Sequence, residues 1–146
     1  MSERTFEQEL ETLVKARYPI IAIETTEWLR FSSVIKDIGV RTGRKVSSWN
    51  RVDGLSRDGH RVADTEDPVD VLRTIYATCL EKRTDPLREI FVLYDYHLYL
   101  EIEELRARLR LLAPEMKYIE ASLLFIGPRF SIPIEIEKAV TIQPMP

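Results

Sequence analysis

The sequence predicts an α/β fold, a three-layer sandwich in which a mostly parallel five-stranded sheet carries helices on both faces. Short apolar runs, such as 90–94 and 122–126, alternate with longer segments whose apolar residues recur at helical spacing. These runs lack the polar alternation of a half-exposed strand, and that is typical of parallel strands buried on both faces. The length of 146 residues suits one core, so we expect residues 1–146 to form a single domain.

The first part of the chain predicts two helices, each followed or preceded by a strand. Residues 3–16 have an amphipathic helical pattern, and the apolar strand 19–24 follows them. A second helix has its inner stripe at spacings of three and four and ends near Gly39 or Gly43. That stripe consists of Trp28, Phe31, Ile35 and Ile38. Residues 46–49 are the second predicted strand.

Residues 50–66 are the least regular stretch, and we expect an exposed loop or a small hairpin there. Asp53-Gly54 and Asp58-Gly59 are both turn signals, with mostly polar residues between them. A hairpin that turns at Asp58-Gly59 would display Arg57, His60 and Arg61 at its tip. Such a loop is a natural place for contacts with a partner.

The second part of the chain continues the alternation. Asp67 and Pro68 predict the start of a third helix, because aspartate caps helices well and proline suits the first helical position. A long helix should follow the third strand, and its wet face places Glu104 four residues before Arg108. Its apolar stripe consists of Leu98, Ile102, Leu105, Leu109 and Leu112.

The last third of the chain completes the predicted sheet. The remaining predicted strands are 90–94, 122–126 and 139–142, and residues 133–138 predict a short helix entered at proline. The proline-rich segment 143–146 is interpreted either as the start of a linker or as a natural terminus.

Composition and charge narrow the classes of partner. The net charge of −3 argues against a dedicated nucleic-acid binder, which usually carries a basic excess. Arg106, Arg108 and Arg110 share their helix with three glutamates, so we interpret it as a solvated mixed-charge face. No apolar run approaches the roughly 20 residues that span a bilayer. We therefore expect a cytoplasmic protein with a protein partner, no membrane contact and no nucleic acid.

Cysteine and aromatic residues fit a packed core. Cys79 is the single cysteine, so no internal disulfide forms, and its place on an apolar helix face predicts a small buried hydrophobe. Trp28, Trp49 and Phe91 are also expected in the core. A further group either lines a crevice or packs at the edge of the sheet, namely Tyr94, Tyr96 and Tyr99.

The turn after the first strand lacks the chemistry of a phosphate-binding loop. Such a loop uses glycines, so that backbone N–H groups wrap the phosphates, and a lysine that neutralises their charge. Here the turn reads Glu24-Thr25-Thr26-Glu27-Trp28, with neither glycine nor lysine. Its two carboxylates would repel a triphosphate. Thr25 and Thr26 are candidates for capping the following helix or, with magnesium present, for offering a hydroxyl to the metal.

Asp95 ends the third predicted strand, at the edge where open α/β sheets bind ligands. We expect it to cap the next helix or pair with an arginine, in preference to holding a metal. Tyr96 follows where a hydrolase of this type would carry a glutamate, so the general base is missing. Arg129 comes after the fourth strand and is expected either to contact an anion or, preferably, to neutralise Asp95 or Glu24.

Several short motifs recur in one order along nearly the whole chain. They are Phe6-Glu7-x-Glu9-Leu10, Ala16-Arg17-Tyr18-Pro19-Ile20-Ile21, Trp49, Gly54-Leu55, Val92-Leu93-x-Asp95-Tyr96, Arg106-x-x-x-Arg110, Ile132-Pro133-x-Glu135-Ile136 and Pro144-Met145-Pro146. With them the chain resembles the N-terminal domain of the predicted AAA-type ATPases of cyanobacteria and chloroplast genomes. The resemblance implies a P-loop NTPase-like sheet of order 5-1-4-3-2. It also implies a degenerate copy of the P-loop core, with the active AAA module following in sequence.

The leading hypothesis is a non-catalytic P-loop-fold domain that mediates protein–protein association or regulates an AAA-type ATPase. Its partner would be an AAA-type ATPase module or a second copy of itself, and it would be no enzyme and need no cofactor. The alternative is a weak nucleotide or anion sensor, in which ATP and magnesium bind at the strand-end crevice. The candidate residues of that vestigial site are Thr25, Thr26, Asp95 and Arg129. A third hypothesis is a hydrolase completed by another chain.

Overall fold

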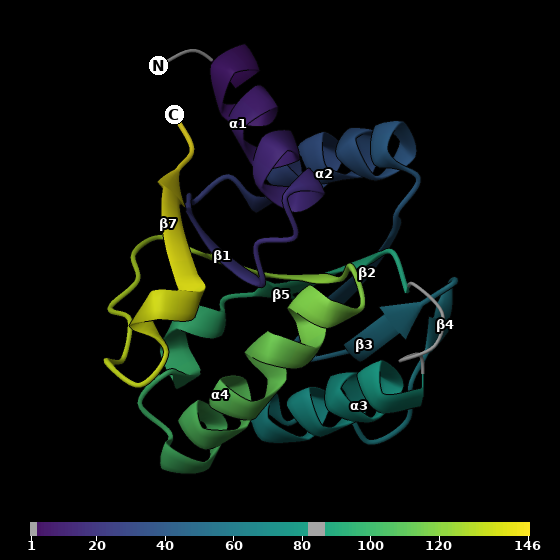
Figure 1. Cartoon of the computed structure of the whole chain (residues 1–146), viewed down its shortest axis with the longest axis vertical. Helices are drawn as coiled ribbons and strands as arrows, with labels where there is room; N and C mark the ends of the chain where they lie inside the picture. The colour runs from purple at the N-terminus through teal and green to yellow at the C-terminus, as the bar shows by residue number, and fades with distance from the viewer. Residues whose placement is uncertain (1–2, 82–86) are drawn as a thin grey trace.

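The structure is a computed structural model that describes residues 3–81 and 87–146, and it has three layers (Figure 1). Helices α1 (Glu3–Lys15) and α2 (Trp28–Thr42) cover one face of a central sheet, and α3 (Pro68–Glu81) and α4 (Glu103–Tyr118) cover the other. Each face has its own apolar core, because successive residues of the central strands point to opposite sides. In strand β6 (Ser122–Gly127), Leu124 packs toward α1 and α2, while Phe125 packs toward α3 and α4. The predicted α/β class is confirmed.

The bounds of the elements follow the predicted alternation. The helices are α1 (Glu3–Lys15), α2 (Trp28–Thr42), α3 (Pro68–Glu81) and α4 (Glu103–Tyr118), with the 3₁₀ turns η1 (Tyr96–Tyr99) and η2 (Glu137–Ala139). The strands are β1 (Ile20–Glu24), β2 (Lys45–Asn50), β3 (Gly54–Arg57), β4 (His60–Arg61), β5 (Glu89–Tyr94), β6 (Ser122–Gly127) and β7 (Val140–Pro144).

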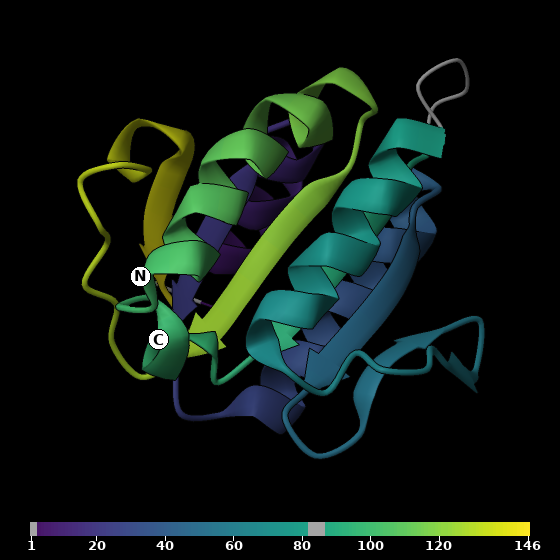
Figure 2. The same ribbon diagram turned by 90° about the horizontal axis from the view of Figure 1, so that it is seen from below.

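The sheet has seven strands in the order β4-β3-β2-β5-β6-β1-β7. The predicted count of five is therefore wrong, and the order of the whole sheet differs with it. The reason is that β3 and β4 pair antiparallel with the edge of β2 instead of standing apart from the sheet. The five parallel strands alone run β7-β1-β6-β5-β2, and Figure 2 shows β7 and the β3–β4 hairpin at opposite ends of the sheet.

The predicted hairpin at Asp58-Gly59 is confirmed. Both residues have positive φ, 53° and 76°, as the favoured two-residue hairpin turns require. His60 is exposed beside the turn, but the expectation that Arg57 is displayed there is wrong. The Arg57 guanidinium turns inward and donates two hydrogen bonds to the carboxylate of Glu89, at 2.6 and 2.9 Å.

Glu89 is a fully buried carboxylate that joins the hairpin to the main sheet. Its side chain is 0% exposed, and the Ser47 hydroxyl donates to the same oxygen that accepts from Arg57 Nε. Lys45 adds a second cation at 3.9 Å. A buried carboxylate is tolerated only where partners replace its water, so this cluster holds the hairpin in place.

Helix α3 begins as the sequence predicts. The Asp67 carboxylate accepts hydrogen bonds from the N–H groups of Val69 and Asp70, at 2.8 and 3.3 Å. Cys79, on the inner face of α3, is fully buried, and its sulfur lies 3.6 Å from that of Met116. Burial raises the pKa of the Cys79 thiol to about 12. The interpretation of Cys79 as a small hydrophobe is confirmed.

Three predicted element boundaries need correction. The long helix α4 begins at Glu103, so Leu98 lies outside its stripe, in η1, and is 64% exposed. Residues 133–138 form a turn and the start of η2 instead of a helix. Within 143–146, Gln143 and Pro144 belong to β7, and the buried Met145 donates its N–H to the Glu24 carbonyl at 3.0 Å.

The Arg57–Glu89 pair gives a stability prediction. Replacing Arg57 with methionine leaves a buried carboxylate without its main cation, and we expect the free energy of unfolding to fall by about 3 kcal/mol. The matched control is Arg61→Met, which removes an exposed pair with Asp53 and should cost about 0.5 kcal/mol. Urea unfolding measures both, and equal losses would contradict the assignment of Glu89 as the anchor.

The buried thiol gives a second prediction. With a pKa of about 12, Cys79 exposes almost no thiolate at pH 8, and its side chain is also sealed from reagent. Ellman's reagent should therefore label the native chain only as fast as the domain unfolds, and should label it at once in strong urea. Fast labelling of the native protein would show that the α3–α4 layer opens locally.

Candidate functional site

The ends of three neighbouring parallel strands bring the predicted site residues to one border of the sheet, here named the carboxyl edge. Glu24 of β1 lies beside Gly127 of β6 in the register of the sheet, and β5 lies on the other side of β6. Residues that follow β1 and β5 are thus separated by two strand spacings, about 10 Å. The predicted residues that share this edge are Thr25, Thr26, Asp95 and Arg129.

The turn between β1 and α2 is tied to the segment that follows β6. The Thr25 N–H donates to the Gly127 carbonyl at 2.8 Å, and the Glu27 N–H donates to the Thr25 hydroxyl oxygen at 3.0 Å. The Glu24 carboxylate accepts the N–H of Phe130 at 3.0 Å. Two of the donors in this turn are therefore used inside the protein, where a phosphate-binding loop keeps them free for its ligand.

The expectation that Thr25 or Thr26 caps α2 is wrong. The residue at the capping position is Glu27, and its side chain makes no capping hydrogen bond. Thr25 is 9% exposed and uses its hydroxyl one step earlier, on the N–H of Glu27, whereas Thr26 is exposed. The buried threonine therefore shapes the turn, and its hydroxyl oxygen already accepts a hydrogen bond.

Asp95 and Arg129 do not make the contacts that the sequence suggests. Asp95 follows β5 with a left-handed backbone, φ 58°, and its side chain does not cap η1. Both side chains are exposed, and neither forms an ion pair within residues 3–81 and 87–146. The predicted neutralisation of Asp95 or Glu24 by Arg129 is wrong, because Glu24 is satisfied by a backbone N–H instead.

Tyr96 points away from the carboxyl edge and into the core. Its hydroxyl donates to the carbonyl of Pro68, the first residue of α3, at 2.6 Å. The ring contacts those of Trp49, Tyr99 and Phe125. Burial raises the pKa of Tyr96 well above its ordinary value, so the hydroxyl stays protonated. Tyr96 thus fastens α3 to the end of β5.

His97 packs directly on the end of β6. A Cβ atom added to Gly127 would lie 2.4 Å from Nδ1 of His97, so only glycine fits there. That nitrogen is buried and has no hydrogen-bond partner among the described residues. The ring of Phe130 meets the imidazole edge to face. Among the described residues, no group of three or more His, Cys, Asp or Glu side chains is arranged to hold a metal ion.

A groove opens beside this edge, between the first turns of α2 and the ends of β2 and β5. It encloses about 590 Å³ and is here named the aromatic groove. Its walls are mostly apolar or aromatic and include Trp28, Val52, Tyr94, Leu98 and Tyr99. Trp28 stands edge to face on Tyr94, with ring centroids 5.9 Å apart. Its charged lining residues are Lys36, Arg51 and Asp95.

The exposed side chains of the aromatic groove correct the predicted core. Trp49 and Phe91 are buried as expected, but Trp28 is 55% exposed. Its helical spacing from Phe31 is right, yet Trp28 is the first residue of α2, and its ring meets Tyr94 at the end of β5 instead of entering the core. Leu98 is exposed because it belongs to η1 and not to α4. Helical periodicity identifies a face of a helix, but not how far the neighbouring sheet extends.

No helix in the described part of the chain is long and apolar enough to cross a bilayer. Two arginines of α4 lie beside acids, as expected of a mixed-charge face: Arg108 Nε lies 2.9 Å from the Glu104 carboxylate, and Arg106 lies 3.7 and 3.9 Å from Glu135 and Glu101.

Comparison with known proteins finds relatives that share one name, that of an AAA domain-containing protein. The chain is 30% identical over 139 residues to the "Uncharacterized AAA domain-containing protein ycf46" of Trieres chinensis, covering 94% of this chain and 27% of that protein. It is 31% identical over 147 residues to the protein of the same name in Guillardia theta, covering 97% and 28%. The chain thus spans about a quarter of the length of these relatives.

A solved structure supports the fold. A chain in the structure of Drosophila ORC bound to AT-rich DNA and Cdc6 superposes with a TM-score of 0.61 at 12% identity, covering 98% of this chain and 53% of that one.

Residues 6–145 match the family described as SpoVK-like AAA ATPase, N-terminal domain. The match covers nearly the whole chain and confirms the resemblance drawn from the sequence motifs. The chain belongs to the family of SpoVK-like AAA ATPase N-terminal domains.

Proposed function

We propose that this chain is a non-catalytic domain with a degenerate P-loop core, and that its aromatic groove binds an AAA-type ATPase module. The observation that supports the proposal most directly is the exposure of Trp28, Leu98 and Val52 around one hollow, at 55, 64 and 83%. Exposed apolar side chains gathered at a concave site are characteristic of surfaces that bind another protein.

The neighbouring turn supports a role other than ATP hydrolysis. The Thr25 and Glu27 N–H groups are already bonded within the protein, and the carboxylates of Glu24 and Glu27 have their own partners in Phe130 and Arg30. At the position after Asp95, the buried hydroxyl of Tyr96 offers no base to activate water. These features favour a scaffold whose edge serves for recognition.

The anatomy of the aromatic groove suits a protein partner. Its lining combines a tryptophan with two tyrosines, and such rings dominate the energetics of protein interfaces. The lining also carries charges of both signs, from Lys36, Arg51 and Asp95. Apolar rings combined with charged groups are common in protein interfaces.

The choice of partner rests on the family. The relatives are named AAA domain-containing proteins, and this chain corresponds to about a quarter of their length. We infer that an AAA-type module accompanies this domain, either within one polypeptide or as a separate subunit. A cytoplasmic location, as predicted from the sequence, belongs to the same proposal.

A nucleotide or anion sensor is the second candidate. It is favoured by one observation, that Asp95 and Arg129 at the carboxyl edge have no ion-pair partner among the described residues. One carboxylate and one guanidinium that remain unneutralised are suitable ligands for a magnesium-bound phosphate.

Variants of the aromatic groove test the first proposal. The probe is the part of the Guillardia theta relative that lies outside the matched region, produced separately and titrated with this chain by calorimetry. Trp28→Ser and Leu98→Ser should each weaken binding by at least tenfold, because both side chains are exposed anchors. The matched control Leu111→Ser, a 62% exposed leucine on α4, should bind like the wild type. Absence of binding, or equal effects of all three variants, would contradict the proposal.

A thermal-shift titration with Mg-ATP, ADP and phosphate separates the two candidates. The association proposal expects no saturable rise of the melting temperature with any of the three. A saturable rise that Asp95→Asn abolishes would establish the sensor instead. Turnover measured on the chain alone and with the same Guillardia theta fragment tests for a hydrolase assembled from two chains, and we expect none.

A further inference from the structure

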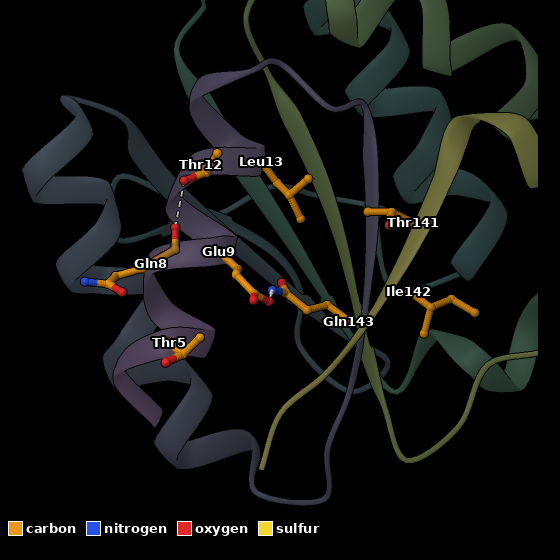
Figure 3. Close-up of a pocket in the computed structure, with 8 residues that line it drawn as sticks. All are labelled: Thr5, Gln8, Glu9, Thr12, Leu13, Thr141, Ile142 and Gln143. Carbon is orange, nitrogen blue, oxygen red and sulfur yellow. Dashed lines mark hydrogen bonds between the residues drawn. The ribbon is translucent and has the colours of Figure 1, made fainter. Parts of the chain in front are cut away.

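A second hollow lies at the β7 border of the sheet, between α1 and the edge strand β7, and is here named the β7 notch (Figure 3). It encloses about 440 Å³. Helix α1 contributes Gln8, Glu9 and Leu13 to its lining, and β7 contributes Thr141 and Gln143. It shares no lining residue with the aromatic groove.

The floor of the β7 notch holds an acceptor without a donor. Gln143 is only 6% exposed, and its Nε2 donates to the Glu9 carboxylate at 3.1 Å. Its Oε1 is buried and has no hydrogen-bond partner among the described residues. Exchanging the two amide atoms would set Oε1 against the carboxylate, so the orphaned atom is the oxygen. Leaving a buried acceptor unpaired is costly, and natural sequences rarely do so without a reason.

Glu9 adds a lone negative charge at the mouth of the β7 notch. The other acids of this helix surface, Glu7 and Glu11, both pair with Arg41 of α2. Glu9 is exposed and forms no ion pair with any residue that the structure describes. Among the described residues, its hydrogen-bond partner is the Gln143 amide. The described lining of the notch therefore offers a carboxylate and an amide oxygen, and includes no cation.

The backbone of β7 is open on the same side. It is the last strand of the sheet and pairs only with β1 in the described part of the chain. The Met145 N–H points to β1, where it reaches the Glu24 carbonyl. Because backbone groups alternate along a strand, Ile142 turns its N–H and carbonyl outward. The opposite border of the sheet is less suited to pairing with another strand. Its edge strand β4 has only two residues, His60 and Arg61, and both are exposed and polar.

From these observations we propose that β7 binds an extended peptide segment that adds a strand to the sheet and places an arginine in the β7 notch. The segment exchanges hydrogen bonds with Ile142, the mode of binding called β-augmentation. A side chain on the new strand, level with Gln143 and on its face, lies about 5 Å from it. Its guanidinium donates to the Glu9 carboxylate and to Gln143 Oε1 together, because a planar fork can reach two acceptors.

The chemistry of the β7 notch discriminates between occupants. A second copy of this chain that paired edge to edge would bring its own Glu9 to the same place, and two carboxylates would repel each other. An apolar side chain would leave the Gln143 oxygen unpaired, and an acidic one would add repulsion. A strand that carries a guanidinium satisfies both acceptors.

The test uses a fluorescein-labelled extended peptide of about nine residues, with alternating threonine and valine and a central arginine. Matched peptides carry glutamate or citrulline at the centre, and a fourth has N-methylated amides along one edge. Fluorescence polarisation should show binding of the arginine peptide at least tenfold tighter than of the glutamate peptide, with citrulline between them. N-methylation of the pairing edge should abolish binding, and backbone amide shifts in NMR spectra should centre on Ile142.

Variants of the chain complete the test. Gln143→Met and Glu9→Gln should each weaken binding of the arginine peptide three- to tenfold, because each removes one acceptor or its charge. Gln143→Met should leave the melting temperature unchanged or raise it, since it removes an unsatisfied buried oxygen. Glu103→Gln, an exposed carboxylate on α4, is the control and should have no effect.

Three outcomes would overturn the proposal. They are equal binding of the arginine and glutamate peptides, amide shifts that avoid β7, and failure of every peptide to bind while the chain self-associates through β7. Loss of binding at the β7 notch leaves binding at the aromatic groove unaffected, so the two proposals fail separately.

Discussion

Burial of the central strands on both faces is the constraint on which the rest of this molecule depends. Every residue of β6 is buried, and β1 and β5 on either side are nearly as well covered. Two pairs of helices provide that cover, α1 with α2 on one face and α3 with α4 on the other. Surfaces for recognition are therefore left mainly at the borders of the sheet and at the strand ends.

Each border has a different character. The carboxyl edge carries a closed turn, two exposed charges of opposite sign and the aromatic groove. The β7 border is open and rich in acceptors, while the β4 border is short and charged. The Glu89 cluster matters here because it fastens the β3–β4 hairpin to the sheet from inside. The two proposed binding surfaces thus lie at different borders of the same sheet.

Local patterns of apolar residues were enough to predict the parallel strands and three of the four long helices. Strands buried on two faces appear as continuous apolar runs, and helices buried on one face have apolar residues at helical spacing. These patterns failed where the outcome depends on distant partners. Pairing of β3 with β2 is a matter of tertiary register, and Arg57 meets Glu89 from 32 residues away. Trp28 is the first residue of α2 and Leu98 belongs to a separate 3₁₀ turn, so both stay exposed although they match the apolar spacing.

The candidate site shows the same division. Strand ends predicted correctly that Thr25, Asp95 and Arg129 share one edge, because parallel strands end together. Their partners were not predictable, since the Glu24 carboxylate is satisfied by the N–H of Phe130, a backbone group with no signature in the sequence. The orphaned oxygen of Gln143 likewise becomes visible only once α1 lies against β7.

The pairing of β1 has a consequence for how the chain is made. β1 hydrogen-bonds only to β6 and β7 among the described strands, with Ile20 beside Leu123 and Val140. During synthesis its apolar residues emerge early, yet both neighbouring strands lie in the last quarter of the sequence. The strand that ends at Glu24 must therefore wait, unpaired and prone to aggregation, until the ribosome has released nearly the whole domain. Newly made chains of this kind are expected to depend on chaperones that shield β1 during that interval.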